Sequence, residues 1–359
     1  MSRVKLGDVA FERKETLKNN TGYPTVGLEH IIPEEIELTN WDEGAENTFT
    51  KVFHVGDVLF GRRRAYLKKA SVAPIDGICS GDITVISAIE DKICPRLLPF
   101  IIQNDKFFDF AVENSAGSLS PRVKWQHAKE FEFELPEMEQ QEKLAELLWA
   151  VNDTKTAYKK LQKQTDELVK SQFIEMFKDV DQGYLSDVAM ITMGQSPSGK
   201  TYNTDGEGVP FYQGKTEFGE LYIGDPTTWT TAPTRYAECN DVLMSVRAPV
   251  GSTNLAIEHC CLGRGLAGIR PIEGKSTSLF ILYSMRNIES QIEGMGVGST
   301  FKAINKDQVY KLPIPLASLS LQEQFVELAE QSDKSKFELE QSISELTATY
   351  KRIIADNLG

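Results

Sequence analysis

Residues 139–178 contain no proline and no glycine, and this stretch constrains the fold more than any other part of the chain. Its apolar and small residues fall three and four positions apart, which predicts a coiled-coil seam rather than the broader stripe of an ordinary surface helix. The predicted seam comprises Leu144, Leu147, Val151, Thr154, Tyr158, Leu161, Thr165 and Leu168, flanked by the solvated residues Lys155, Lys159, Lys160, Lys163, Asp166 and Glu167. An unbroken helix here would be roughly 60 Å long, at ~1.5 Å per residue. Because a helix of this length cannot bury its seam alone, it requires a partner.

A second stretch without proline or glycine, residues 321–354, supplies a partner within the same chain. Its predicted seam has large residues at Phe325, Leu328, Leu339, Leu346 and Ile353, and small residues at Ser332, Ser335, Ser342 and Thr349 that would let two helices approach closely. The two helices also begin alike, because Pro136 is followed by Gln141-Glu142 and Pro315 by Gln322-Glu323. We interpret Tyr158 and Phe325 as packing residues. Phe173, Met176 and Phe177, at the end of the first long stretch, could dock either a partner protein or the segment that lies between the two long stretches.

Each long helix follows a segment that resembles the other such segment. The sequence Leu6–Ala10 returns as Leu185–Ala189, and Gly56–Phe60 returns as Asn240–Met244. Two further matches follow in the same order and at nearly the same spacing: Ala116–Ser118 with Val297–Ser299, and Phe133–Pro136 with Leu312–Pro315. Four ordered matches indicate an internal duplication.

Short β-branched runs bounded by glycine and aspartate predict strands in both copies, at 52–55, 58–60, 83–86, 242–246 and 266–270. Helices are predicted at 94–110 and 277–294. At 359 residues the chain suits two domains with extra elements. The predicted boundaries are 1–137 for the first globule, 138–180 for the first long helix, 181–318 for the second globule and 319–359 for the second helix. The predicted fold class is α+β, with two similar mixed α/β globules separated by two long coiled-coil helices.

Composition limits the compartment and the chemistry. There is no apolar run of about 18 residues that could span a membrane, and the first residues lack the apolar core of a signal peptide, so we expect a cytoplasmic protein. The five cysteines form no Cys-x-x-Cys pair and the four histidines are scattered, which disfavours structural zinc. The net charge of −13 lowers the expectation that the isolated chain binds DNA. Because phosphate binding depends on the local field, the charge fits a protein that shares DNA with a larger, more basic partner.

Two nucleotide-binding motifs match in letters but not in context. Residues Gly194–Thr201 fit G-x-x-x-x-G-K-[ST], but turn residues follow where a phosphate-binding loop requires a helix. Residues Gly263–Gly268 fit G-x-G-x-x-G, but Pro271 prevents a helix from continuing there. No other catalytic or metal-binding constellation is recognisable, so we predict a non-catalytic chain.

The duplicated globule, the two long helices, the Leu-x-Asp-Val-Ala openings at 6–10 and 185–189, and the proline-then-glutamine helix starts together resemble the DNA-specificity (S) subunit of type I restriction–modification systems. The resemblance covers essentially the whole chain and includes Gly56–Phe60 and Gly194–Ser198. It implies that each globule is a target-recognition domain reading half of a bipartite double-stranded DNA site, and that the helices pack antiparallel and hold the half-sites apart. It further implies that two methyltransferase subunits and the motor–nuclease restriction subunits are partners. S-adenosylmethionine and ATP with Mg would then belong to the partners, and this chain would carry no cofactor.

Candidate DNA-binding residues rest on side-chain chemistry, because base edges are read by polar and basic side chains on loops while basic groups on phosphates set the register. In the first copy they are Arg62, Arg63, Arg64, Tyr66, Lys68 and Lys69, and Ser118, Ser120, Arg122 and Lys124. In the second copy they are Gln213, Lys215, Arg247, Arg264, Ser299, Thr300, Lys302 and Lys306. Two other interpretations stay open: a nucleotide-binding enzyme built on Gly194–Thr201, and a protein-interaction rod without DNA contact.

Overall fold

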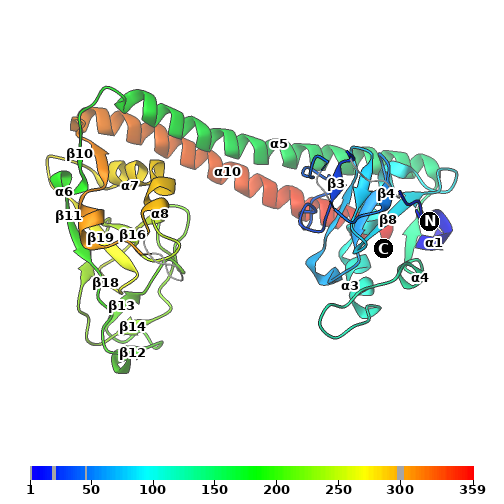
Figure 1. Ribbon diagram of the computed structural model, residues 1–359, viewed down its shortest axis with the longest axis horizontal. Coiled ribbons are helices and arrows are strands. Elements are labelled where there is room, and N and C mark those ends of the chain that lie inside the picture. The colour runs from blue at the N-terminus through cyan, green and yellow to red at the C-terminus, as the bar shows by residue number, and fades with distance from the viewer. Residues whose placement is uncertain (1, 18–21, 45–46, 297–302) are drawn as a thin grey trace. The chain divides into compact units, whose positions relative to one another are not determined.

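The computed structural model describes residues 2–17, 22–44, 47–296 and 303–359. The chain divides into two compact units, of which unit 1 comprises Met1–Lys160 with Leu339–Gly359, and unit 2 comprises Leu161–Glu338. The two long helices therefore each contribute residues to both units (Figure 1).

The described residues of unit 1 form three small sheets. The four-stranded sheet has the order β2 (Ala10–Glu12), β8 (Ile83–Ala88), β5 (Val58–Gly61) and β6 (Ala70–Val72). A three-stranded sheet has the order β3 (Thr25–Val26), β7 (Gly77–Cys79) and β4 (Lys51–Phe53), and β1 (Ser2–Lys5) pairs with β9 (Glu132–Leu135). The helical elements are α1 (Leu6–Val9), η1 (Ala65–Leu67), η2 (Pro95–Leu97), α2 (Leu98–Ile102), α3 (Asp105–Glu113) and α4 (Trp125–Ala128). Phe60, Phe100 and Phe107 are fully buried in the core that joins the four-stranded sheet to α2 and α3.

Unit 2 repeats this arrangement. Its four-stranded sheet has the order β11 (Ala189–Met193), β19 (Leu266–Pro271), β16 (Val242–Ser245) and β17 (Thr253–Leu255). A five-stranded sheet has the order β12 (Tyr202–Asn203), β14 (Trp229–Thr230), β13 (Val209–Tyr212), β18 (Cys260–Leu262) and β15 (Tyr236–Ala237), and β10 (Gln182–Tyr184) pairs with β20 (Pro313–Pro315). The helical elements are α6 (Leu185–Val188), η3 (Gly199–Thr201), α7 (Ser278–Asn287), α8 (Glu289–Met295) and α9 (Lys306–Tyr310).

The duplication extends to the register of the strands. In the antiparallel pairs, Val58 lies opposite Ile86 in the first copy, and Val242 lies opposite Ile269 in the second. The parallel pairs β3–β7 and β13–β18 match in the same way. The repeated opening motif has a local cause, because the carboxylate of Asp8 accepts from the backbone N–H of Lys5 and that of Asp187 accepts from Tyr184, which caps α1 and α6. The predicted duplication and α+β fold class are confirmed.

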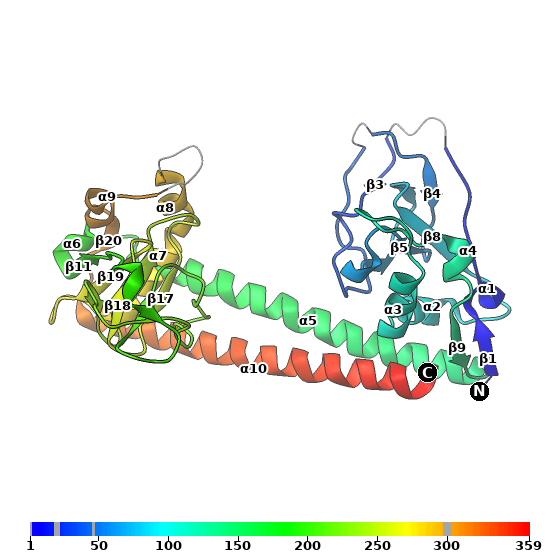
Figure 2. The same ribbon diagram turned by 90° about the horizontal axis from the view of Figure 1, so that it is seen from below.

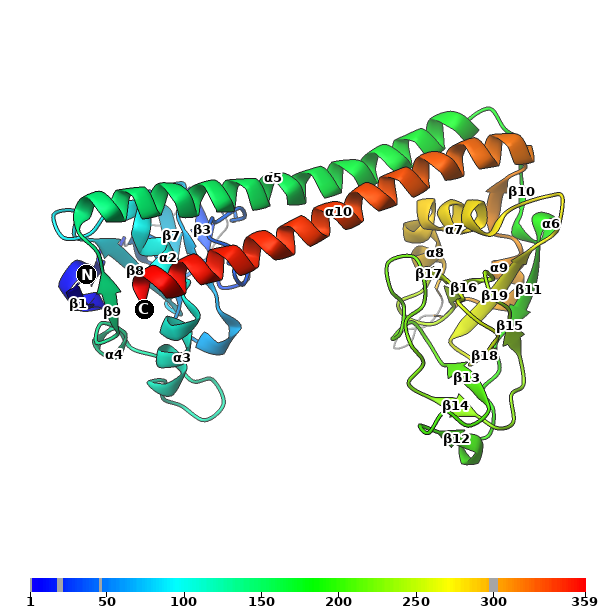
Figure 3. The same ribbon diagram turned by 180° about the vertical axis from the view of Figure 1, so that it is seen from behind.

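The long helices are α5 (Met138–Phe177) and α10 (Leu319–Leu358), each of 40 residues. In unit 1 the start of α5 packs beside the end of α10, where Leu148 and Leu358 share one core (Figure 2 and Figure 3). In unit 2 the end of α5 packs beside the start of α10, so the helices are antiparallel within each unit. There the rings of Phe173 and Phe177 pack against Phe280 of α7, with centroids 6.2 and 5.1 Å apart, and Met176 is partly buried against the same core, so all three residues pack on the second globule.

Half of the predicted seam of α5 is wrong. Leu144, Val151, Tyr158 and Thr165 face inward, but Leu147, Thr154, Leu161 and Leu168 are exposed, and Leu148, Lys155, Gln162 and Val169 take their place. In α10 the predicted seam residue Ser335 is likewise exposed. The pattern misled because polar residues occupy inward positions: burial lowers the pKa of the Lys155 ammonium, and the Gln162 amide donates to the backbone oxygen of Lys336 at 3.4 Å.

The predicted helices at 94–110 and 277–294 are both broken. The first divides into η2, α2 and α3, because Asn104 caps α3 by accepting from the backbone N–H of Lys106 at 3.0 Å. The second divides into α7 and α8 at Ile288.

The repeated glutamine explains why the two long helices begin alike. Gln141 is buried, and its side chain accepts from the backbone N–H of Cys94 and donates to the backbone oxygen of Pro136, both at 2.8 Å. Gln322 is also buried and accepts from the backbone N–H of Thr277 at 3.2 Å while donating to Lys275 and Ala317 oxygens at 2.9 Å. Each glutamine therefore binds its long helix to a loop of the preceding globule. Gln141 of α5 binds the residue before η2, and Gln322 of α10 binds the residue before α7.

Candidate nucleic-acid interface

The two predicted basic segments of the first globule meet beyond the end of β5. Arg63 and Arg122 form an isolated antiparallel bridge. On either side of it, the N–H of Val123 donates to the oxygen of Arg62 at 3.0 Å and the N–H of Arg64 donates to Pro121 at 2.8 Å. The backbone therefore places Arg62–Arg64 beside the loop that carries Ser118, Ser120, Arg122 and Lys124.

One carboxylate organises this cluster, which we call the Asp82 cluster (Asp82, Arg63, Ser120 and Arg122). Asp82 accepts from Nε of Arg122 at 2.7 Å and from Nη1 of Arg63 at 3.2 Å, and Nη2 of Arg63 donates to Oγ of Ser120 at 3.2 Å. The side chain of Asp82 is 20% exposed, against 38% for Arg63 and 43% for Arg122. The hydrogen bonds from Arg122 and Arg63 lower the pKa of Asp82, so the carboxylate stays ionised.

The other candidates of the first globule are dispersed. Tyr66 and Arg64 are exposed, and Arg64 has a left-handed backbone with φ of 54°. Lys68 pairs with Asp105 at 2.5 Å and Lys69 donates to the backbone oxygen of Leu28 at 2.5 Å, so both ammonium groups make internal contacts. Ser118 and Lys124 are exposed, whereas Nε of Arg62 is buried and makes no hydrogen bond within the residues described.

In the second globule the four candidates Gln213, Lys215, Arg247 and Arg264 line one cavity of about 180 Å³, together with Ser196, Gly214, Ser245, Ala248 and Gly265. Nζ of Lys215 donates to Oγ of Ser252 at 3.3 Å. Among the residues that the structure describes, the guanidinium groups of Arg247 and Arg264 have no ion-pair or hydrogen-bond partner, and both residues are exposed. We call this the Arg247 cavity.

The Arg247 cavity occupies the position of the Asp82 cluster in the duplicated scaffold. In the second copy the backbone N–H of Val246 donates to the backbone oxygen of Gly265 at 2.9 Å, and in the first copy the backbone N–H of Arg62 donates to the backbone oxygen of Asp82 at 3.0 Å. Likewise, Arg247 forms an isolated antiparallel β-bridge with Ala303, and Arg63 forms one with Arg122. Gly265 therefore stands where the first copy has Asp82. A Cβ at Gly265 would lie 2.3 Å from the backbone oxygen of Gln213, so this close approach excludes a carboxylate there.

The remaining candidates of the second globule are not brought into the cavity. Lys306 begins α9, and its Nζ lies 5.0 Å from the centroid of the Tyr310 ring. Ser299, Thr300 and Lys302 lie outside the residues that the structure describes. Sequence reasoning missed Asp82 and Ser196, because a single aspartate after Gly81 and a serine in a polar loop carry no distinguishing pattern.

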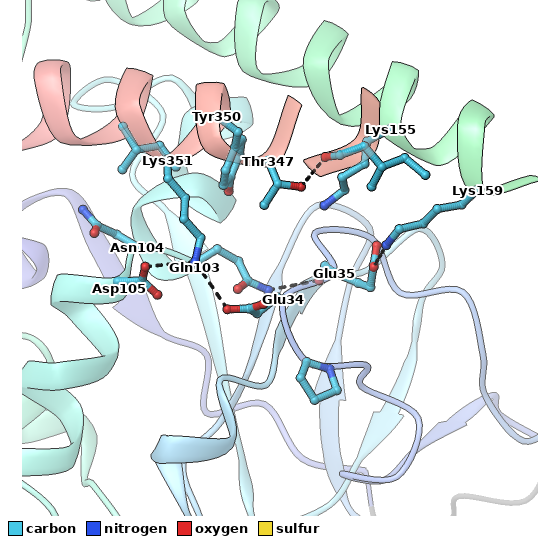
Figure 4. Close-up of a pocket in the computed structure, with 13 residues that line it drawn as sticks. Glu34, Glu35, Gln103, Asn104, Asp105, Lys155, Lys159, Thr347, Tyr350 and Lys351 are labelled. Atoms are coloured by element: carbon cyan, nitrogen blue, oxygen red, sulfur yellow. Dashed lines mark hydrogen bonds and ion pairs between the residues drawn. The ribbon is translucent and has the colours of Figure 1, made fainter. Parts of the chain in front are cut away.

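A second cavity of about 180 Å³ lies in unit 1 between the globule and the adjoining parts of α5 and α10 (Figure 4). Its charges are matched internally: Lys351 lies between Asp105, at 3.2 Å, and Glu34, at 3.6 Å, while Lys159 pairs with Glu35. This cavity is a structural junction with balanced charge, unlike the Arg247 cavity.

The nucleotide-binding motifs do not have the structure that their chemistry requires. Gly194–Thr201 ends in the three-residue η3 and continues as strand β12, so no helix N-terminus faces a phosphate site there. Residues from Leu266 onward form strand β19. Within the residues described there is no group of three or more potential metal ligands, and no helix long and apolar enough to cross a membrane.

These features define a class: a duplicated α+β protein in which each repeat carries polar loop residues at one site and ends in a long helix. A family model described as the type I restriction modification DNA specificity domain matches residues 178–347. A putative type I restriction enzyme MjaX specificity subunit from Methanocaldococcus jannaschii is 29% identical over 341 residues, covering 85% of this chain and 79% of that protein.

Solved structures agree. One solved chain comes from structural work on the complex assembly and conformational transition of the type I R-M system. It is 31% identical to this chain, with a TM-score of 0.67 over 99% of this chain and 97% of that one. The type I restriction–modification S subunit from M. genitalium has a TM-score of 0.59 over 98% of this chain and 94% of its own length, at 11% identity, and shares the fold. The chain belongs to the family of DNA-specificity subunits of type I restriction–modification systems, and the resemblance drawn from the sequence is confirmed.

Proposed function

We propose that this chain reads a bipartite double-stranded DNA target, one half-site through each globule. The observation that supports this most directly is the equivalence of the Asp82 cluster and the Arg247 cavity. The two sites occupy the same place on a duplicated backbone but differ in side-chain chemistry. Two equivalent sites with different side chains suit two half-sites of different sequence.

Each site offers the donors that DNA recognition uses. Arginine and glutamine reach base edges in the major groove, whereas lysine and serine contact phosphates. The Arg247 cavity holds Gln213 and Lys215 beside the guanidinium groups of Arg247 and Arg264, which have no partner among the residues described. With a net charge of −13, the chain depends on this local field for DNA binding, and on partners for the rest.

The chain itself is proposed to be non-catalytic. Two methyltransferase subunits and the motor–nuclease subunits would carry the chemistry, with S-adenosylmethionine and ATP with Mg bound to them. This division is supported by the strand that follows Gly194–Thr201 in place of a helix, and by the family to which the chain belongs. Linked half-site readers gain affinity only at the right separation, so the proposal also predicts a fixed spacer in the target.

The test uses the chain assembled with its methyltransferase subunits. Replacing both Arg247 and Arg264 with alanine is expected to weaken DNA binding by roughly 1–3 kcal/mol for each base-reading arginine, or to lower the salt slope by about one for each phosphate contact. Arg352→Ala, an exposed arginine on α10, is the control. If the double variant binds DNA as the control does, the Arg247 cavity is not part of the DNA interface.

A further inference from the structure

The Asp82 cluster leaves one guanidinium edge free. Arg122 donates to Asp82 through Nε, and within the described chain its Nη1 and Nη2 make no other hydrogen bond. Arg63 instead divides its two terminal nitrogens between Asp82 and Ser120. Arg122 therefore presents a pair of parallel donors to solvent while its inner nitrogen is held, and Arg63 is occupied on both ends.

The carboxylate is not needed to hold the two loops together. In the second globule the same backbone contacts form around Gly265: Val246 donates to Gly265, Ile304 donates to Val246 at 3.0 Å, and Arg247 bridges Ala303. No carboxylate stands at that position. The function of Asp82 must accordingly lie in what it does to the arginine side chains, since the backbone scaffold forms without it.

We propose that Arg122 reads a guanine in the half-site bound by the first globule, and that Asp82 is the residue that positions its guanidinium. This inference rests on the proposed DNA-reading function. Two parallel N–H donors match O6 and N7 of guanine in the major groove, which is the commonest specific contact of arginine with DNA. Holding Nε with an ionised carboxylate removes rotamer freedom before binding, so less entropy is lost when the base is bound.

The experiment selects binding sites from a randomised duplex library with the complete complex of this chain and its methyltransferase subunits. Arg122→Lys keeps the positive charge but removes the pair of parallel N–H donors. Asp82→Asn keeps the side-chain shape but removes the negative charge. A second arginine–carboxylate pair, Arg3 with Glu132 at 2.8 Å between β1 and β9, supplies matched controls in Arg3→Lys and Glu132→Gln. Thermal unfolding of every complex is recorded alongside.

With Arg122→Lys we expect discrimination for guanine at one position of one half-site to fall by about 10- to 100-fold, because lysine lacks the two parallel donors. The salt slope should not change, because lysine keeps the positive charge. Asp82→Asn should lower discrimination at the same position without lowering non-specific affinity, since it removes a negative charge. Neither control should change the selected sequence.

Three outcomes separate the failures. A wild-type complex that selects no sequence would overturn the proposed function itself. A wild-type complex that selects a sequence which Arg122→Lys selects equally well would overturn this inference and leave DNA reading intact. Loss of discrimination at an A·T pair would refute the assignment of guanine. Because both substitutions are conservative, and Asp82→Asn reports on the same base as Arg122→Lys, misfolding of one variant does not leave the inference without a test.

Discussion

Replacing Gln322 with alanine should destabilise unit 2 through the loss of one buried hydrogen-bonded side chain. Gln322 is 1% exposed, and its amide serves the Thr277 N–H, the Ser276 hydroxyl and the Lys275 and Ala317 oxygens. Each buried polar group left without a partner costs about 1–3 kcal/mol. Water entering the space would satisfy some of these four polar groups, so we expect the free energy of unfolding to fall by about 3 kcal/mol.

The neighbouring glutamine provides a close control. Gln324 is exposed on the same turn of α10, so Gln324→Ala should change stability by less than about 0.5 kcal/mol. The free energies of unfolding come from urea denaturation, and hydrogen exchange at the Thr277 amide reports the lost bond directly. The first copy offers the parallel pair Gln141→Ala and Gln140→Ala, with a smaller loss because Gln141 serves two groups. If Gln322→Ala and Gln324→Ala unfold at the same denaturant concentration, the repeated glutamine does not fasten the helix to its globule.

Two further predictions concern the seam and the Asp82 cluster. Leu148→Ala should cost about 2–5 kcal/mol while Leu147→Ala costs little, because Leu148 is fully buried and Leu147 is 49% exposed; equal losses in urea denaturation would restore the seam predicted from the sequence. The pKa of Asp82 lies below its ordinary 3.8, so its stabilising contribution is present above that pH and is lost as pH falls through the lower folded-state pKa. Acid unfolding should therefore show wild type more stable than Asp82→Asn at neutral pH and equal to it in strong acid; a difference that persists in strong acid would contradict this assignment.

The fold could be predicted from the sequence because its signals are long or repeated. Forty residues without a helix breaker predict a helix whatever surrounds them, and the matched openings at Asp8 and Asp187 reveal the duplication. The register of the seam could not be predicted. Periodicity treats Lys155 as a flanking residue and leaves Gln162 out of the seam. Both nevertheless face inward, because the aliphatic stem of Lys155 can be buried and the Gln162 amide finds a backbone partner.

The grouping of some candidate residues could be predicted from the sequence, whereas their binding to DNA stays a prediction. Arg, Lys and Gln on loops indicate DNA chemistry, and the structure brings Gln213, Lys215, Arg247 and Arg264 into one cavity. What the sequence did not indicate is the carboxylate that binds two of the arginines in the first globule. Asp82 is separated from Arg122 by some forty residues, and only the fold brings them together.

The duplication also separates scaffold charges from site charges. Asp57 and Asp241 occupy equivalent buried positions, immediately before β5 and β16, and each binds one arginine through two hydrogen bonds. The arginine is Arg13, after β2, in the first copy and Arg270, within β19, in the second. The arginine comes from a different strand in each copy, but in both copies it neutralises the buried carboxylate, as a buried charge requires.

At the loop site no such compensation occurred. Gly265 replaces Asp82 and Ala303 replaces Arg122, which leaves Arg247 without a carboxylate among the residues described. A charge that is rebalanced in each repeat serves folding, whereas one left open in an exposed cavity is available to a partner outside the chain. Under the function proposed for this chain, the anionic partner that would occupy the Arg247 cavity is DNA.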